Sequence, residues 1–222
     1  MKNILFAFSI LVILCGASGL KAQTEFADTL SSAQLYELAE EAMENKGWER
    51  AREALKRWMK TEDPTLESWL NLGTAHLFLK DEKDAEKAFK EALDKDKSNM
   101  VALEGLCEVY LIRDKEKDML KTLERIEKLT PESRKLTYYK ALAADRFKLK
   151  QYAENYFWDT LEEMVRSDSQ DTKTLEVLCD AYINDQFLER GILFLTEMQD
   201  LHGERSEYLF QLARIYTHTG DE

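Results

Sequence analysis

Proline, glycine and cysteine are all scarce in this chain. Its 222 residues include 2 Pro, 8 Gly and 3 Cys. β-Sandwiches and β-barrels need many turns that contain Gly and Pro, so the composition disfavours both classes. Three Cys are too few for a small disulfide scaffold. Leu, Glu, Lys and Ala are abundant instead, and because they are good helix formers the composition predicts an all-α protein.

The chain also lacks an apolar run of about 20 residues, the length needed to cross a bilayer. A shorter run, Ile4 to Leu14, follows a start that carries Lys2 and precedes small residues. This pattern is typical of a secretory signal, here cleaved between Ala22 and Gln23. A lipoprotein signal that uses Cys15 and an uncleaved anchor are the alternatives. The sequence therefore predicts an exported protein, periplasmic or secreted, with no membrane span after signal removal.

The chain also has no excess of basic residues. The chain has 31 Lys and Arg against 43 Asp and Glu, a formal net charge of −12. Such a chain repels nucleic acid and anionic lipid surfaces, so nucleic acid is excluded as a partner. Most acids alternate with Lys, as in residues 80–84, which is typical of solvated helix faces.

The chain repeats with a period close to 34 residues. A small residue follows a Leu in every unit, in a column formed by Ala39, Gly73, Cys107, Ala143, Cys179 and Ala213. The apolar residues around it are spaced as on an amphipathic helix. Each unit is therefore predicted to be two antiparallel helices that cross closely at the small residue. The predicted organisation is a signal peptide (1–22), a short linker (23–30) and a helical repeat domain (31–222), with repeats near 32–65, 66–99, 100–135, 136–171 and 172–205 and a partial repeat at 206–222.

Helix starts are predicted from capping residues. Asp63-Pro64 and Thr130-Pro131 each place a capping residue before a Pro, which is favoured at the first helical position. Asp171 can cap a helix without a Pro.

The second unit carries the fullest motif: Trp69-x2-Leu72-Gly73-x2-His76, then Ala85-x3-Phe89. It resembles the tetratricopeptide repeat family, whose pattern has Tyr at the position of His76 and Pro at that of Lys97. The resemblance covers about residues 31–222 and implies a right-handed superhelical solenoid of antiparallel helix hairpins. In that family the first helices of the hairpins line a concave groove, which implies a surface that binds protein or peptide segments.

Two units depart from the pattern. In the fourth, Asn155 and Asp159 stand where Ala and Phe are expected. Its second helix could instead follow Ala153, Phe157, Leu161 and Met164, with a shorter turn before it and a longer linker after it. The sixth unit has one helix only, which would expose Leu209, Leu212 and Tyr216. Either the chain is part of a longer protein, or this helix caps the stack alone.

No constellation in the sequence predicts catalysis, a cofactor or a metal ion. The three His lack zinc-site spacing, and His76 is expected to pack where the repeat has Tyr. Cys107 and Cys179 are expected to be buried free thiols, because a whole repeat separates them and a disulfide needs Cα atoms within about 7 Å. We therefore predict a non-enzymatic protein.

The functional prediction concerns the concave groove. The groove residues lie between the packing positions of the first helices: Tyr36, Glu37, Glu40, Glu44, Asn71, Thr74, Phe78, Glu104, Glu108, Lys140, Phe147, Asp180, Phe210 and Arg214. The first half of this set is acidic and the second half is mixed. The basic clamp with which some family members hold a C-terminal carboxylate is absent. The sequence thus predicts a scaffold or adaptor of the cell envelope that binds a protein or peptide, with a basic segment as the favoured partner. The alternatives are a structural subunit of an envelope assembly that docks by its convex face or its end, and the repeat region of a longer enzyme.

Overall fold

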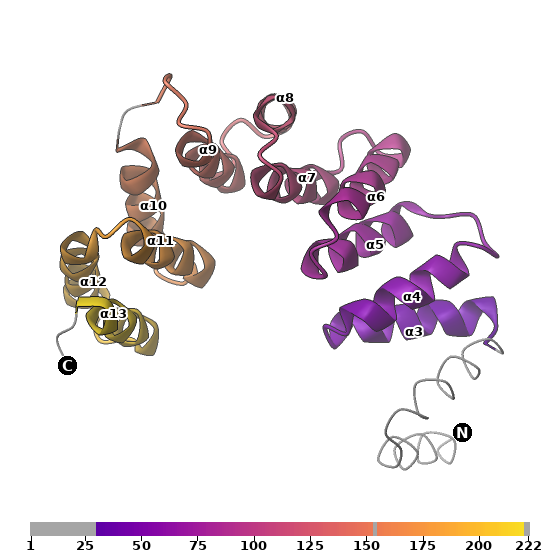
Figure 1. Ribbon diagram of the computed structural model, residues 1–222, viewed down its shortest axis with the longest axis horizontal. Coiled ribbons are helices and arrows are strands. Elements are labelled where there is room, and N and C mark those ends of the chain that lie inside the picture. The colour runs from indigo at the N-terminus through magenta and orange to yellow at the C-terminus, as the bar shows by residue number, and fades with distance from the viewer. Residues whose placement is uncertain (1–29, 153–154, 220–222) are drawn as a thin grey trace, which may run out of the picture. The chain divides into compact units, whose positions relative to one another are not determined.

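The computed structural model describes residues 30–152 and 155–219, so the predicted signal peptide and nearly all of the linker lie outside the described residues. Within the described ranges every regular element is a helix and no strand occurs, which confirms the predicted all-α class (Figure 1). The helices are α3 (Ser32–Glu44), α4 (Trp48–Trp58), α5 (Leu66–Phe78), α6 (Glu82–Lys95), α7 (Met100–Ile112), α8 (Glu116–Leu129), α9 (Arg134–Arg146), α10 (Tyr156–Ser167), α11 (Thr172–Asn184), α12 (Leu188–His202) and α13 (Ser206–Thr219).

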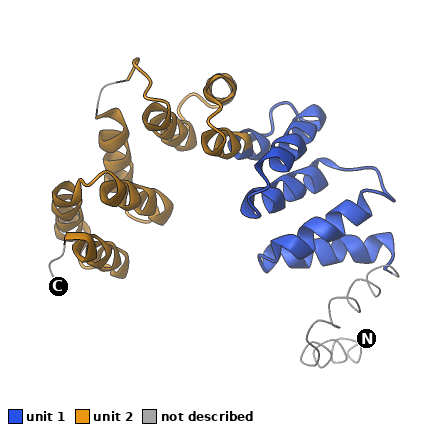
Figure 2. Ribbon diagram, in the orientation of Figure 1, with its two compact units in different colours: residues 1–105 blue, residues 106–222 orange. Residues whose placement is uncertain are grey.

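The chain divides into two compact units, residues 1–105 and 106–222, at a point inside α7 (Figure 2). In unit 1, α3 packs on α4 and α5 packs on α6. In unit 2, α9 packs on α10 and α11 packs on α12. Each of these pairs is a hairpin of consecutive helices, as the repeat pattern predicts.

The helix starts differ from prediction at both Pro residues. Thr65 caps α5 with its side chain and Ser133 is the N-cap residue of α9, so Pro64 and Pro131 lie before the caps and not in the first helical turns. Thr65 takes the N-cap position because its hydroxyl accepts a hydrogen bond from a backbone N–H of the first turn, and Pro has no side-chain group that could do so. Asp171 caps α11 by the same kind of hydrogen bond, as predicted.

The turns between first and second helices share one backbone conformation. In each, a residue other than Gly has a positive φ, between 49° and 62°: Lys46, Lys80, Asp114, Lys148 and Gln186. The next residue donates its N–H to a carbonyl five residues earlier, as Asp81 does to His76 at 2.9 Å. This is the Schellman arrangement, which usually has Gly at the left-handed position. A side chain there costs about 1–2 kcal/mol.

The small column is buried in the first five units. Cys107, Ala143 and Cys179 are fully buried. Gly73 faces the ring of Phe89 from α6, and a Cβ atom added to Gly73 would lie 2.7 Å from that ring. Ala213 is exposed, as a sixth unit with one helix only implies, because no second helix covers α13 within the described residues.

The fourth hairpin is irregular. Its connection spans residues 147–155, whereas the corresponding connections elsewhere are 45–47, 79–81, 113–115 and 185–187. α10 packs through Phe157, Leu161 and Met164, as the second predicted register requires. The turn before it is longer, however, and not shorter as that register predicted. Ala153 lies outside the described residues.

Candidate partner-binding surfaces

Three carboxylates define an acidic face on α3 in unit 1. Glu37, Glu40 and Glu44 are exposed, and their spacing of three and four residues places them along one side of the helix. None of the three forms an ion pair with another described residue. Like charges at this spacing repel each other by about 0.2–0.5 kcal/mol per pair. We call these residues the α3 acidic face.

Two aromatic residues form a partly exposed stack beside it. The ring of Phe78, at the end of α5, lies 4.2 Å from the ring of Trp48, with an angle of 4° between the planes. Phe78 remains 59% exposed. Because Trp48 follows Glu44 by one short turn, the stack lies near the C-terminal end of the α3 acidic face. Such a surface can take the methylene stem or the cation of a Lys or Arg side chain.

The other predicted groove residues of unit 1 are less accessible. Tyr36 packs against Trp58, with ring centroids 5.0 Å apart. Burial, together with Glu67 and Glu40, raises the pKa of Tyr36. Asn71, Thr74 and Glu104 are half-buried. The accessible part of the prediction in unit 1 is therefore the α3 acidic face with the Phe78 ring.

In unit 2 the predicted groove acid Glu108 is already occupied. Its Oε1 accepts hydrogen bonds from the Tyr139 hydroxyl at 3.0 Å and from the Lys173 ammonium at 3.2 Å. The same ammonium lies 5.3 Å from the centre of the Tyr138 ring. Three helices thus share one polar cluster, and Glu108 offers a partner little free charge.

Other predicted residues of unit 2 are also paired. Arg214 of α13 forms an ion pair with Asp180 of α11, and Lys140 binds Glu127 at 2.7 Å. Phe210 is exposed, and Phe147 is half-buried at the end of α9. The predicted residues of this unit therefore include one large, accessible apolar side chain and few free charges.

A groove of about 310 Å³ lies on unit 2 between its first helices. Its apolar wall is formed by Leu111, Leu142, Val177, Ala181 and Phe157. Asp145, Arg146, Asp180 and Asn184 also line the groove. The groove can hold an apolar side chain, and only Asp180 among its lining residues belongs to the predicted set.

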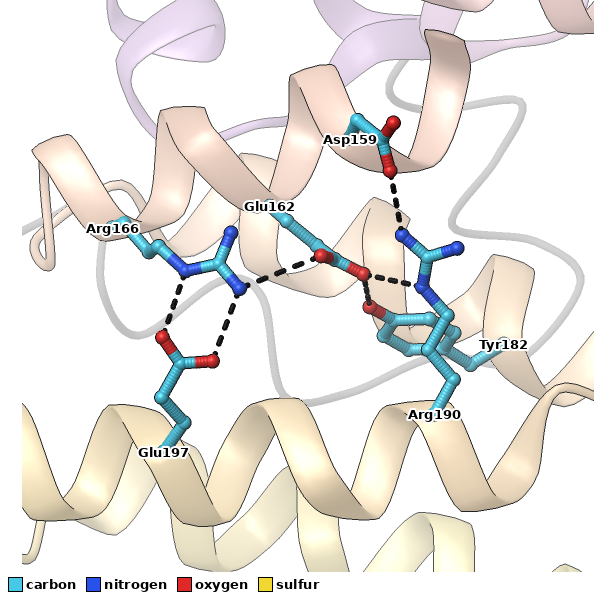
Figure 3. Close-up of polar contacts among 6 residues, drawn as sticks. All are labelled: Asp159, Glu162, Arg166, Tyr182, Arg190 and Glu197. Carbon is cyan, nitrogen blue, oxygen red and sulfur yellow. Dashed lines mark hydrogen bonds and ion pairs between the residues drawn. The ribbon is translucent and has the colours of Figure 1, made fainter. Parts of the chain in front are cut away.

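A buried carboxylate occupies the middle of a charged network in unit 2 (Figure 3). Glu162 of α10 is 8% exposed, and it accepts hydrogen bonds from the Tyr182 hydroxyl at 2.5 Å and from Arg190 Nε at 2.6 Å. Arg190 also binds Asp159 at 2.9 Å. Burial, together with Glu162, raises the pKa of Tyr182.

The network continues along α10 and α12. Arg166 binds Glu197 through two hydrogen bonds of 3.0 Å and lies 3.5 Å from Glu162. Arg166 and Arg190 also lie over the rings of Phe194 and Trp158. Every charged member of the network has an opposite charge beside it, so the arrangement joins three helices and leaves no free acid or base.

Our sequence interpretation missed this network, although one signal was present. Glu162 stands between Trp158 and Val165 at helical spacing, so its side chain falls on the apolar side of α10. A carboxylate on an apolar face needs a buried partner. The identity of that partner, Arg190, depends on the packing of α10 against α12, which α10 alone does not reveal.

His76 is buried as predicted, with 2% exposure. Its Nδ1 lies 3.2 Å from Asp81 Oδ2, and that oxygen also accepts a hydrogen bond from Arg52 at 3.1 Å. Burial lowers the pKa of His76, while its contact with Asp81 acts in the opposite direction. The residue therefore packs inside the hairpin and contacts Asp81 in the turn that follows α5.

The described ranges contain no group of three His, Cys, Asp or Glu side chains placed to hold a metal ion. No helix in residues 30–152 or 155–219 is long and apolar enough to cross a bilayer. Cys107 and Cys179 are both buried, and no disulfide joins them, as expected. Burial raises the pKa of Cys179 to about 12.

Comparisons with known proteins concern the fold. The sequence matches no protein-family model and no curated protein. The structure is similar to a thermophilic TPR protein of Thermus thermophilus, with a TM-score of 0.62 and 12% identity over 84% of this chain and 100% of that chain. A tetratricopeptide repeat protein from Parabacteroides merdae gives a TM-score of 0.58 and 14% identity over 86% of this chain and 74% of that chain.

The fold is that of tetratricopeptide repeats. MamA from Desulfovibrio magneticus is also similar, with a TM-score of 0.59 and 19% identity over 79% of this chain and 97% of that chain. At these identities the likeness establishes the TPR fold of this chain and does not identify a partner. The TPR fold does explain why the small column and the left-handed turns recur at one period.

Proposed function

We propose that this TPR protein is a non-enzymatic scaffold that captures a Lys- or Arg-bearing protein segment on unit 1. The observation that carries the proposal is the α3 acidic face, whose three exposed carboxylates have no cationic partner among the described residues. Their mutual repulsion falls when a cation binds, so a basic segment gains both the attraction and that relief.

The stack of Phe78 on Trp48 supplies the apolar part of the same surface. A Lys stem or an Arg guanidinium can lie on the exposed Phe78 ring while its charge meets the carboxylates. Carboxylates beside an exposed ring favour a Lys or Arg side chain over a small cation such as ammonium. The ring packs favourably against methylene groups and planar guanidinium groups, which a small cation lacks. The acids of unit 2 support the choice of unit 1, since Glu108 and Asp180 are already paired.

The test uses a short fluorescent peptide of alternating Lys and Leu, and a matched peptide with Glu in place of Lys. We expect the Lys peptide alone to bind, and its binding to weaken as salt rises from about 50 mM to about 500 mM. Glu40→Lys with Glu44→Lys should weaken binding by at least roughly tenfold. Glu116→Lys with Glu124→Lys is the matched control, because it changes net charge equally on exposed residues of α8.

Two outcomes contradict the proposal. The α3 double variant could retain full affinity while its helical circular dichroism signal is unchanged, which would remove the α3 acidic face from the function. Alternatively, both double variants could lose affinity equally, which would show that net charge and not this surface attracts the peptide.

We further propose that the protein works outside the cytoplasm, from the Lys2 start and the Ile4–Leu14 run. The mature protein should then begin at Gln23. Mass spectrometry of the protein from its native cells measures this directly. An intact Met1, or a lipid on Cys15, contradicts it.

A further inference from the structure

The groove on unit 2 is lined by apolar side chains from four helices. Its wall is formed by Leu111 of α7, Leu142 of α9, Phe157 of α10, and Val177 and Ala181 of α11. The aromatic ring is buried, and the other four side chains are half-buried. Because α9 already packs on α10 and α11 already packs on α12, the groove is not the place of an absent hairpin helix. We call it the unit 2 groove.

The size of the unit 2 groove suits one large side chain. Its volume of about 310 Å³ lies at the lower end of the roughly 300–1,000 Å³ that is typical of pockets for small-molecule ligands. One aromatic side chain buries about 150–250 Å² and can supply much of the binding energy of an interface. The unit 2 groove is therefore suited to a single aromatic anchor from a partner segment.

The charges of the unit 2 groove are already neutralised within the protein. Arg146 forms an ion pair with Asp114 at 2.7 Å. Asp145 binds Lys148 at the same distance, and Asp180 has its cation on α13, as described above. A charged side chain of a partner would thus have to leave water without gaining a free opposite charge, which is costly. The group that enters should be uncharged.

The groove also offers acceptors for hydrogen bonds. In Asp145 and in Asp180 one carboxylate oxygen, Oδ2, accepts no hydrogen bond from any residue in 30–152 or 155–219. The side-chain amide of Asn184 likewise has no partner in those ranges. Among aromatic side chains, the indole of Trp combines the largest apolar body with one N–H donor and no acceptor. Phe has no donor, and Tyr has a smaller ring system.

We propose that the unit 2 groove binds the indole of a Trp residue in an uncharged segment of a partner protein. The ring packs on the apolar wall, and its Nε1–H donates a hydrogen bond to a carboxylate oxygen of the lining. Acidic residues beside the Trp are disfavoured, because Asp145 and Asp180 would face them. This surface is separate from the α3 acidic face, and its affinity does not depend on a basic partner.

Fluorine NMR of the full chain with a capped pentapeptide, Gly-Ser-Trp-Ser-Gly with a fluorinated indole, tests the proposal. We expect a dissociation constant on the order of 1 mM, as for one anchoring side chain. Unlabelled competitors then carry Trp, Ala, or a benzothiophene side chain that has sulfur in place of the indole N–H. Ala should not displace the probe. The benzothiophene should compete about threefold to tenfold less well than Trp, because it lacks the hydrogen bond.

Variants of the chain locate the site. Ala181→Phe fills the groove with a ring of its own and should weaken binding by at least roughly tenfold. Ala213→Phe is the matched control, because it adds the same ring to an exposed residue of α13 that does not line the groove, and it should change affinity by less than about twofold. Phe78→Ala on unit 1 should also have little effect. A rise in salt from about 50 mM to about 500 mM should change little, because the indole is uncharged.

The proposal is overturned if the Ala competitor displaces the probe as well as the Trp competitor does. It is also overturned if Ala181→Phe keeps full affinity with an unchanged helical circular dichroism signal, or if Ala181→Phe and Ala213→Phe lose affinity equally. If Ala181→Phe loses its helical signal, Ala181→Leu takes its place, and full affinity in that variant contradicts the proposal. A loss in Phe78→Ala alone would assign the indole to the aromatic stack of unit 1 and overturn it.

Discussion

Because Gly73 contacts the ring of Phe89, the effect of Gly73→Ala on stability should change sign when that ring is removed. A Cβ added at Gly73 would lie 2.7 Å from the Phe89 ring, closer than normal van der Waals contact. Gly in a helix interior costs about 1 kcal/mol relative to Ala, so Gly73→Ala gains that amount from propensity alone. Forcing a methyl group into a packed core costs about 1–3 kcal/mol. We expect a net destabilisation of up to about 2 kcal/mol.

Removal of the ring should reverse the sign. Phe89→Ala alone costs about 3–5 kcal/mol, because it leaves a cavity in unit 1. In that background the methyl group at Gly73 meets no ring, and Gly73→Ala should then stabilise the protein by up to about 1 kcal/mol. The expected coupling between the two changes is about 1–3 kcal/mol.

Urea unfolding followed by circular dichroism measures all four proteins of this cycle. Gly47→Ala serves as the control, since a Cβ at Gly47 meets no atom closer than 3.5 Å and should change stability little. The reasoning would be refuted if Gly73→Ala stabilised the protein in both backgrounds, because the ring would then impose no limit on the small column.

Three further predictions use the same unfolding assay. Lys80→Gly should raise the free energy of unfolding by about 0.5–1 kcal/mol, because Gly adopts the left-handed backbone of residue 80 without strain. Lys87→Gly in the middle of α6 should lower it by about 1 kcal/mol, and equal losses for the two variants would show that residue 80 is not strained. Because burial lowers the pKa of His76 in the folded protein, stability should fall as the pH drops from the ordinary pKa of 6.5 towards the lowered pKa. His76→Tyr should reduce that loss, and a variant with an unchanged pH profile would show that His76 is not its source. Glu162→Gln should lower stability by about 3–5 kcal/mol, because it leaves Arg190 and Arg166 without their buried carboxylate. Glu197→Gln, at the exposed edge of the network, should lower it by up to about 1 kcal/mol, and similar losses for both variants would mean that burial does not decide the effect.

The repeat architecture could be predicted because each hairpin repeats the same local requirement. A small residue such as Gly73 is needed wherever two helices cross closely, so the column is visible in the sequence without knowledge of the packing. Helix starts were harder, because Asp63, Pro64 and Thr65 are all acceptable near a helix start. The structure selects Thr65, whose side chain hydrogen-bonds the first turn.

The candidate site was predictable in part. Periodicity placed Glu37, Glu40 and Glu44 along one exposed side of α3, because this depends on one helix alone. It could not show that Glu108 is bound by Lys173, since those residues are 65 positions apart and meet only through packing. The charge of a surface residue can be predicted from the sequence, whereas whether that charge is already paired depends on neighbours that only the fold brings close.

The two buried thiols of unit 2 make the opening of individual hairpins measurable. Cys107 lies in the third hairpin and Cys179 in the fifth, and both are fully enclosed. A thiol reagent can react with either only after the surrounding helices separate, so each modification rate reports a local opening equilibrium. In repeat proteins neighbouring units can open independently or together. Equal rates at the two thiols would indicate that unit 2 opens as one cooperative body, and unequal rates would rank its hairpins by local stability.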